Sequence, residues 1–129
     1  MFDYARQRAI EALSLPRKVV LATSGPAGVQ AGEFLCEAKE LVLYLLLPRT
    51  SDQLFNLEHN CTATLLSDGW ELKGEAQIVA ASSPGLDLNL LQEPGSEWCV
   101  LVRVDPVRIQ IRRAGGWGNI ETIDLNSHQ

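Results

Sequence analysis

The sequence predicts an all-β barrel or sandwich, and three observations lead to this prediction. Short apolar runs rich in β-branched residues recur along the chain, turn residues separate them, and only two stretches have helical spacing. The length of 129 residues suits a single hydrophobic core. We expect one domain over residues 1–129. Its parts are an N-terminal helix over 1–15, the barrel over 17–113 and a C-terminal extension over 114–129.

The first half of the chain predicts a helix followed by a strand meander. Residues 3–14 place their apolar side chains on roughly one side, which predicts an amphipathic helix that ends at Pro16. The apolar, β-branched run 18–24 predicts a buried strand, and the Gly- and Pro-containing stretch 25–28 predicts a turn. The next two strands are expected over residues 29–38 and 40–47.

The second half repeats the pattern of strand, turn and strand. The Asp-Gly pair at 68–69 is a strong hairpin signal. Residues 82–96, rich in Ser, Pro and Gly, predict a loop around a short helix. The Asp-Pro pair at 105–106 predicts another turn. Four strands are expected, over residues 61–67, 70–80, 97–104 and 107–113, and a last extended piece ends the chain.

Charge and cysteine usage exclude several classes of protein. The chain has 11 basic and 16 acidic residues, a net charge of −5, which opposes nucleic-acid binding. No apolar run approaches the roughly 20 residues of a membrane helix, and Asp3 and Glu11 interrupt any secretory signal. Cys36, Cys61 and Cys99 form no metal or disulfide pattern, so we expect three buried thiols in a reducing cytoplasm.

Catalytic and metal-binding patterns give no assignment. The two histidines, His59 and His128, lie far apart and have no visible acidic partner. His59 falls near the end of a predicted helix, where the helix dipole favours it as an ordinary polar residue. Neither a P-loop nor a GxGxxG motif is present. The catalytic residues are therefore unknown at this stage.

The corner after the third predicted strand is the best candidate site. The apolar run stops at Pro48, and Leu54 then begins a helical pattern. One interpretation is structural, because Thr50-x-x-Gln53 is a capping-box pattern. The other is a phosphate site, because free N–H groups at a helix start bind anions and an adjacent Arg49 adds donors. The sequence leaves both interpretations open.

Four pieces of sequence, taken in order, resemble a known family. They are "LATSG" in the first strand, "LYL" in the third, Ser-x-Gln-x-x-Asn-Leu at the corner and Trp-x-x-x-Gly-x-Ala in a later strand. Together they resemble the pyridoxamine 5′-phosphate oxidase-like family of flavin-binding split barrels, over residues 5–113. The resemblance implies an antiparallel split β-barrel with flanking short helices. It also implies a homodimer that holds flavin mononucleotide (FMN) in clefts at the subunit interface, although some members use a deazaflavin or haem.

The resemblance also implies a set of cofactor residues. In the family, the positions of Arg49, Thr50, Ser51 and Gln53 hold the flavin phosphate, and the strand segment from Gln30 through Ala31 to Phe34 lies along the ring system. Trp117 of the partner copy would close the site, and its alternative is packing over the dimer seam. This sequence departs from the family at two positions, because Gln53 replaces a common Lys and Ala31 a common Arg.

Two functions follow from these residues. The first is an FMN-dependent oxidoreductase with an unknown substrate, working as a cytoplasmic homodimer without nucleic acid or membrane. The alternative is a non-enzymatic split barrel that has lost its flavin and binds another ligand or a partner. A single-stranded nucleic-acid-binding barrel is a third hypothesis, which the acidic balance opposes.

Overall fold

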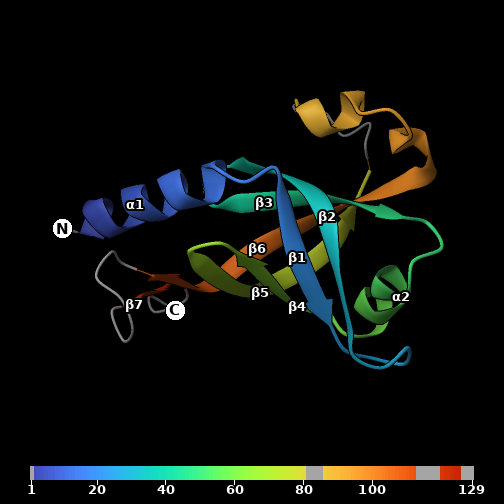
Figure 1. Ribbon diagram of the computed structural model, residues 1–129, viewed down its shortest axis with the longest axis horizontal. Coiled ribbons are helices and arrows are strands. Elements are labelled where there is room, and N and C mark those ends of the chain that lie inside the picture. Colours follow the sequence, from blue (N-terminus) through green and yellow to red (C-terminus); the bar gives the residue numbers. More distant parts are fainter. Residues whose placement is uncertain (1, 81–85, 113–119, 126–129) are drawn as a thin grey trace.

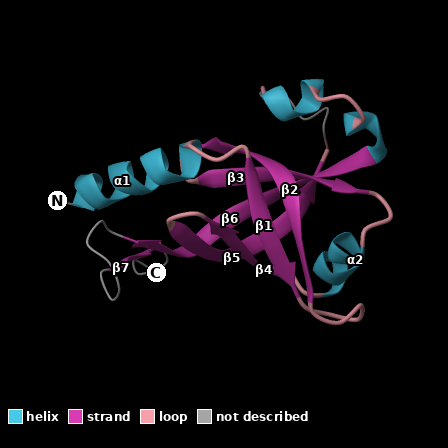
Figure 2. Ribbon diagram, viewed as in Figure 1, coloured by secondary structure: helices cyan, strands magenta, loops and turns pink. Residues whose placement is uncertain are grey.

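The structure, a computed structural model, describes residues 2–80, 86–112 and 120–125. These residues form helices and strands in the order shown in Figures 1 and 2. The helices are α1 (Phe2–Ser14), α2 (Asp52–His59) and two short 3-10 turns, η1 (Asn89–Gln92) and η2 (Ser96–Trp98). The strands are β1 (Lys18–Thr23), β2 (Gln30–Lys39), β3 (Val42–Pro48), β4 (Thr62–Ser67), β5 (Trp70–Val79), β6 (Cys99–Arg112) and β7 (Ile120–Asp124).

The strands close into an antiparallel barrel, which confirms the predicted fold class. Their order in the sheet is β3-β2-β1-β4-β5-β6-β7, and an additional pairing of β3 with β6 closes the first six into a barrel. Strand β7 continues the sheet beyond the barrel by pairing with β6. Helices α1 and α2 lie at opposite ends of the barrel (Figure 1). The two helical signals of the sequence are therefore confirmed as flanking helices.

The barrel interior is filled by the alternate residues of each strand. Strand β1 shows the pattern, because Val19 and Leu21 are buried while Lys18 is exposed. Both helices contribute to the same core through the apolar faces that the sequence predicts. The core residues from the helices are Ala9 and Leu13 of α1 and Leu54 and Leu57 of α2.

Strand β3 is apolar on both faces because a second layer covers its outer side. Its inward residues belong to the barrel core, while Tyr44 and Leu46 point outward into a smaller cluster. Leu88 just before η1, Leu90 within it and Leu101 of β6 complete that cluster. The short helix expected in the 82–96 loop is thus the 3-10 turn η1, whose Leu90 N–H donates to the Glu37 carboxylate of β2 at 3.0 Å.

The predicted turn at Asp105-Pro106 is wrong. Both residues lie inside β6, which runs unbroken for 14 residues. Strand β5 pairs along its length with β6, and the register shifts between Lys73 and Gly74, where Pro106 sits opposite Gly74. Proline lacks the N–H that a ladder requires, so a bulge is one of the few places where a strand accepts it. Long-range pairing with β5 therefore overrides the local turn signal.

The expectation of three buried thiols holds for one cysteine only. Cys36 is buried, and its thiol donates to the Pro16 carbonyl at 3.4 Å. Burial, with a smaller contribution from the Glu37 carboxylate, raises the pKa of Cys36 to about 11, so the thiol stays protonated and unreactive at neutral pH. Cys61 is exposed and Cys99 is half-buried.

Candidate functional site

The corner between β3 and α2 is held by two backbone hydrogen bonds. The N–H of Arg49 donates to the Trp98 carbonyl at 3.2 Å, and the N–H of Ser51 donates to the Pro48 carbonyl at 3.0 Å. The side chains of Arg49 and Thr50 are exposed. Among the described residues, the Arg49 guanidinium has no hydrogen-bond or ion-pair partner. The corner therefore presents one free cation on a fixed backbone.

Ser51, and not Thr50, caps the helix, so the predicted capping box is wrong by one residue. The Ser51 hydroxyl accepts the Leu54 N–H at 3.2 Å, and the Ser51 carbonyl accepts the Phe55 N–H at 3.3 Å. The N–H groups of Asp52 and Gln53 have no acceptor among the described residues. The helix start thus keeps two free amide donors, which is the feature that favours anions.

The side chain of Gln53 points into the protein. It is 5% exposed, and its amide nitrogen donates to the Leu21 carbonyl at 2.9 Å. Its carbonyl oxygen accepts the hydroxyl of Thr23, which is also buried. Both polar groups of Gln53 are therefore bonded within the fold, and they face β1 instead of the exposed corner.

Asn56 completes the same buried polar network, and the sequence reasoning gave it no role. It is fully buried; its amide nitrogen donates to the Gly28 carbonyl at 2.8 Å and to the Thr23 hydroxyl at 3.2 Å. Its carbonyl oxygen accepts the Ala27 N–H at 2.9 Å. The network clamps α2 onto the β1–β2 hairpin. The Asn in the Ser-x-Gln-x-x-Asn-Leu motif was the available signal, since a buried amide must find partners.

The predicted residues of β2 lie on two different faces. Phe34 packs against the barrel core. The Phe34 ring and the Gln53 amide both border Gly32: a Cβ built on Gly32 would lie 3.4 Å from the ring carbon Cζ and 3.7 Å from the amide nitrogen. Gln30 donates to the Ala27 carbonyl at 2.8 Å, and Ala31 is exposed on the opposite face of the strand. Phe34 and Gln53 therefore both lie next to Gly32.

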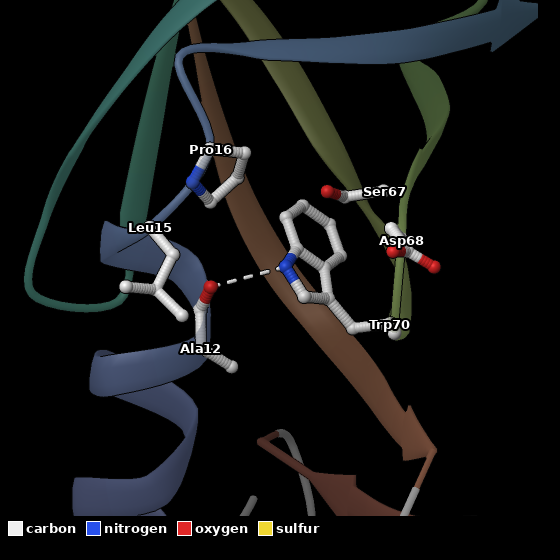
Figure 3. Close-up of a pocket in the computed structure, with 7 residues that line it drawn as sticks. Ala12, Leu15, Pro16, Ser67, Asp68 and Trp70 are labelled. Carbon is white, nitrogen blue, oxygen red and sulfur yellow. Dashed lines mark hydrogen bonds between the residues drawn. The ribbon is translucent and has the colours of Figure 1, made fainter.

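The cavities near α1 lie away from this corner. Figure 3 shows one of about 380 Å³ between the last turn of α1 and the β4–β5 hairpin, where the Trp70 indole donates to the Ala12 carbonyl at 3.1 Å. A second, of about 460 Å³, lies beside it and shares Leu15 and Pro16 in its lining. None of the predicted cofactor residues that the structure describes lines either cavity.

The described residues offer no metal site, and His59 is bonded within its own helix. No group of three or more His, Cys, Asp or Glu side chains within them could hold a metal ion. His59 ends α2, where its ring bonds the Phe55 carbonyl at 3.0 Å and packs edge-on against the Phe55 ring. No helix in the described ranges is long and apolar enough to span a membrane. Trp117 lies outside the described residues.

The chain is similar in structure to several solved proteins. No family model matches it, and no curated protein matches it significantly. General stress protein 26 from Bacillus anthracis superposes with a TM-score of 0.71 at 20% identity, covering 95% of this chain and 99% of the other. A related protein from Clostridium acetobutylicum, described as of the pyridoxinephosphate oxidase family, gives 0.67 at 17% identity, covering 99% and 97%.

This chain has the pyridoxamine 5′-phosphate oxidase-like split-barrel fold. A FAD-binding protein from Mesorhizobium loti shares it, with a TM-score of 0.61 at 12% identity over 80% of this chain and 90% of the other. An F420 reductase (TM-score 0.61) and a heme storage protein from Vibrio cholerae (TM-score 0.58) have the fold too. The split barrel thus serves several flat cofactors, and the fold alone does not select one.

The residues of this split barrel fit one phosphate group with a reduced set of donors. As far as the described residues go, the free groups are the Arg49 guanidinium, the Thr50 hydroxyl and the two unpaired amides of the first helical turn. Gln53 adds no charge and its amide is bonded elsewhere. The Asp52 carboxylate, also in the first turn, competes for the same donors. One cation in place of two predicts weaker binding than the family pattern implies.

Proposed function

We propose that this chain is a cytoplasmic, homodimeric split-barrel protein that binds FMN and acts as a flavin-dependent oxidoreductase on a substrate not yet known. One observation carries the proposal: within the described part of the chain, the Arg49 guanidinium has no partner, and it lies at the corner before a helix whose first two N–H groups have no acceptor. A guanidinium fork and helix-start amides are the donors that phosphate recognition uses. The three free cysteines agree with a reducing compartment.

In this proposal the chain supplies position and electrostatics. Arg49 and Thr50 bind the phosphate, and the end of β2 around Ala31 lies along the ring. The partner subunit's Trp117 covers the ring from the other side. A bound flavin supplies the hydride and electron transfer itself, so the protein needs no acid–base pair of its own.

A second candidate function rests on Gln53. Its amide is fixed between Leu21 and Thr23, so the position that the family commonly gives to a cation contributes none here. A split barrel that has lost flavin and binds another ligand or a protein partner agrees with this observation. The two candidates make opposite predictions for flavin binding.

The visible spectrum of the purified protein and its response to FMN separate the two candidates. The first candidate predicts a yellow protein, or a colourless one whose melting temperature rises with added FMN because ligand binds only the folded state. A colourless protein whose melting temperature is unchanged at millimolar FMN would leave the second candidate.

Arg49→Ala tests the phosphate contact directly. Charge-assisted hydrogen bonds contribute about 1.5–3 kcal/mol each, so we expect FMN affinity, measured by equilibrium dialysis, to fall about 10- to 100-fold. Arg6→Ala is the matched control, because Arg6 is exposed on α1 at the other end of the barrel and forms a surface ion pair with Glu40 at 3.6 Å. Equal affinities in the Arg49 and Arg6 variants would contradict the assignment.

A further inference from the structure

The cavity between the end of α1 and the β4–β5 hairpin takes no part in the proposed function. Its volume of about 380 Å³ falls within the roughly 300–1,000 Å³ that small-molecule sites usually have. The described residues that line it come from two segments, 12–16 and 67–70. It therefore lies at the α1 end of the barrel, away from the Arg49 corner (Figure 1).

Most of the cavity wall is apolar. Leu15 is 81% exposed, so this large side chain is left unused by the barrel core, and Pro16 lies next to it. The Trp70 indole lies between the end of α1 and the hairpin (Figure 3), and its N–H is already bonded to the Ala12 carbonyl. The indole thus offers its ring carbons to a ligand, which suits an apolar or aromatic group.

The polar groups of the cavity stand together on the hairpin side of the indole. Figure 3 shows Ser67 and Asp68 there, opposite Leu15. In the part of the chain that the structure describes, neither side chain has a hydrogen-bond or ion-pair partner. Asp68 is also the one charged side chain among the described lining residues. The cavity therefore combines an apolar wall with an unpaired carboxylate and hydroxyl.

The charges next to the cavity leave Asp68 uncompensated. Asp68 also lines an adjoining cavity of about 350 Å³, together with Lys18 and Glu33. The charges of Lys18 and Glu33 are opposite, so their sum is zero and the carboxylate of Asp68 sets the sign. A ligand with a positive charge is thus favoured over a neutral or negative one.

We infer that this cavity is a binding site for a small organic amine with an aromatic or alkyl body. The ammonium group of the ligand donates to the Asp68 carboxylate and to the Ser67 hydroxyl. Its apolar body lies between Leu15 and the Trp70 indole. The site goes beyond the proposed function, because it shares no residue with the Arg49 corner.

The first test compares three probes on the full chain. Phenethylamine has both the charge and the ring, 2-phenylethanol has the same body without the charge, and methylamine has the charge without the body. We expect a dissociation constant of about 1 mM for phenethylamine, a plausible value for so small a ligand, and affinities at least about 10-fold weaker for the other two. Titrations followed by nuclear magnetic resonance measure these constants, and the indole N–H signal that Trp70→Phe removes serves as the local reporter.

Asp68→Asn tests the charge contact. The replacement keeps the hairpin intact, because Asn-Gly is as good a turn pair as Asp-Gly. We expect it to weaken phenethylamine binding about 10-fold and to leave 2-phenylethanol binding unchanged. Asp87→Asn is the matched control, because Asp87 is exposed and is not among the residues that line this cavity.

Leu15→Ala tests the apolar contact. Because Leu15 is mostly exposed, its loss should leave the stability of the fold nearly unchanged. We expect phenethylamine and 2-phenylethanol to lose about 3- to 10-fold in affinity together. Val29→Ala is the matched control, since Val29 is 82% exposed on the β1–β2 turn.

The outcomes decide the inference separately from the proposed function. Phenethylamine binding that shifts the Trp70 signal and depends on Asp68 and Leu15 supports it, with or without FMN binding. Equal affinities for phenethylamine and 2-phenylethanol, an unchanged affinity in Asp68→Asn, or no saturable binding at tens of millimolar would overturn it. FMN affinity should be the same in Asp68→Asn as in the unaltered chain, so a failure of FMN binding bears on the Arg49 corner alone.

Discussion

The amide side chains of Gln53 and Asn56 show how a motif residue can serve the fold. A phosphate role for Gln53 is a reasonable hypothesis from a helix start, where polar residues usually face solvent. In the structure its amide instead satisfies the Leu21 carbonyl inside the protein. The sequence could not decide between these directions, because both place Gln53 one residue inside the helix. Burial of α2 against β1 decides it.

Asn56→Leu tests the buried network at the residue scale. The replacement is similar in size but leaves the Ala27 N–H and the Gly28 carbonyl without partners. These two groups are only partly buried, whereas the lost bond to the Thr23 hydroxyl is buried. A lost buried hydrogen bond costs roughly 1–3 kcal/mol, so we expect a loss of about 1–3 kcal/mol in the free energy of unfolding, measured by urea denaturation at fixed protein concentration. Asn89→Leu, at an exposed position of η1, is the control and should change stability by less than about 0.5 kcal/mol. Equal effects would show that the network contributes nothing.

At the scale of elements, the β5–β6 pair explains why a local signal failed. Asp105-Pro106 has turn chemistry, yet β6 continues through it because β5 supplies a partner strand along the whole length. Gly74 makes this approach feasible. A Cβ on Gly74 would lie 2.5 Å from the Asp105 carbonyl oxygen, which is backbone and cannot move aside. Gly74 and the bulge therefore act together to let β5 and β6 pair closely at this point.

Gly74→Ala tests the close approach of β5 to β6 at the bulge. Forcing a methyl group against the β6 backbone should lower the free energy of unfolding by about 1–3 kcal/mol, the usual cost of overpacking. Gly32→Ala is the comparison, because its nearest contact is the side chain of Phe34 at 3.3 Å, which can shift. Denaturation curves should show the Gly74 variant as the less stable of the two. The reverse order would mean that the bulge relaxes at no cost.

At the scale of the whole molecule, closure of the barrel separates two regions. Pairing of β3 with β6 places the α2 corner at one end and α1 with its two cavities at the other (Figure 1). The Arg49 corner is open to solvent in the single chain. In the proposed function a second copy covers the bound ring, so the dimer is part of that proposal.

Sedimentation equilibrium tests the dimer. We expect a species of twice the chain mass of 14.2 kDa at micromolar concentration. Dilution should shift it toward monomer, and FMN should oppose that shift if the site includes both copies. A monomer at every concentration, with and without FMN, would contradict an interface site.

The sequence by itself determined the elements of this protein, because alternating apolar runs and turn residues are local features. Its pattern predicted an all-β barrel or sandwich, both helices and the corner that bears Arg49, and a family resemblance narrowed the fold to a split barrel. Tertiary structure decided which side chains remain free. Arg49 and Trp98 stay exposed, whereas the side chains of Gln53 and Asn56 are hydrogen-bonded inside the protein. Strand β6 continues through Asp105-Pro106, where the sequence predicts a turn. The reason is that residues far apart in the sequence decide whether a polar side chain is buried and bonded or left exposed. A local sequence pattern does not contain these distant contacts.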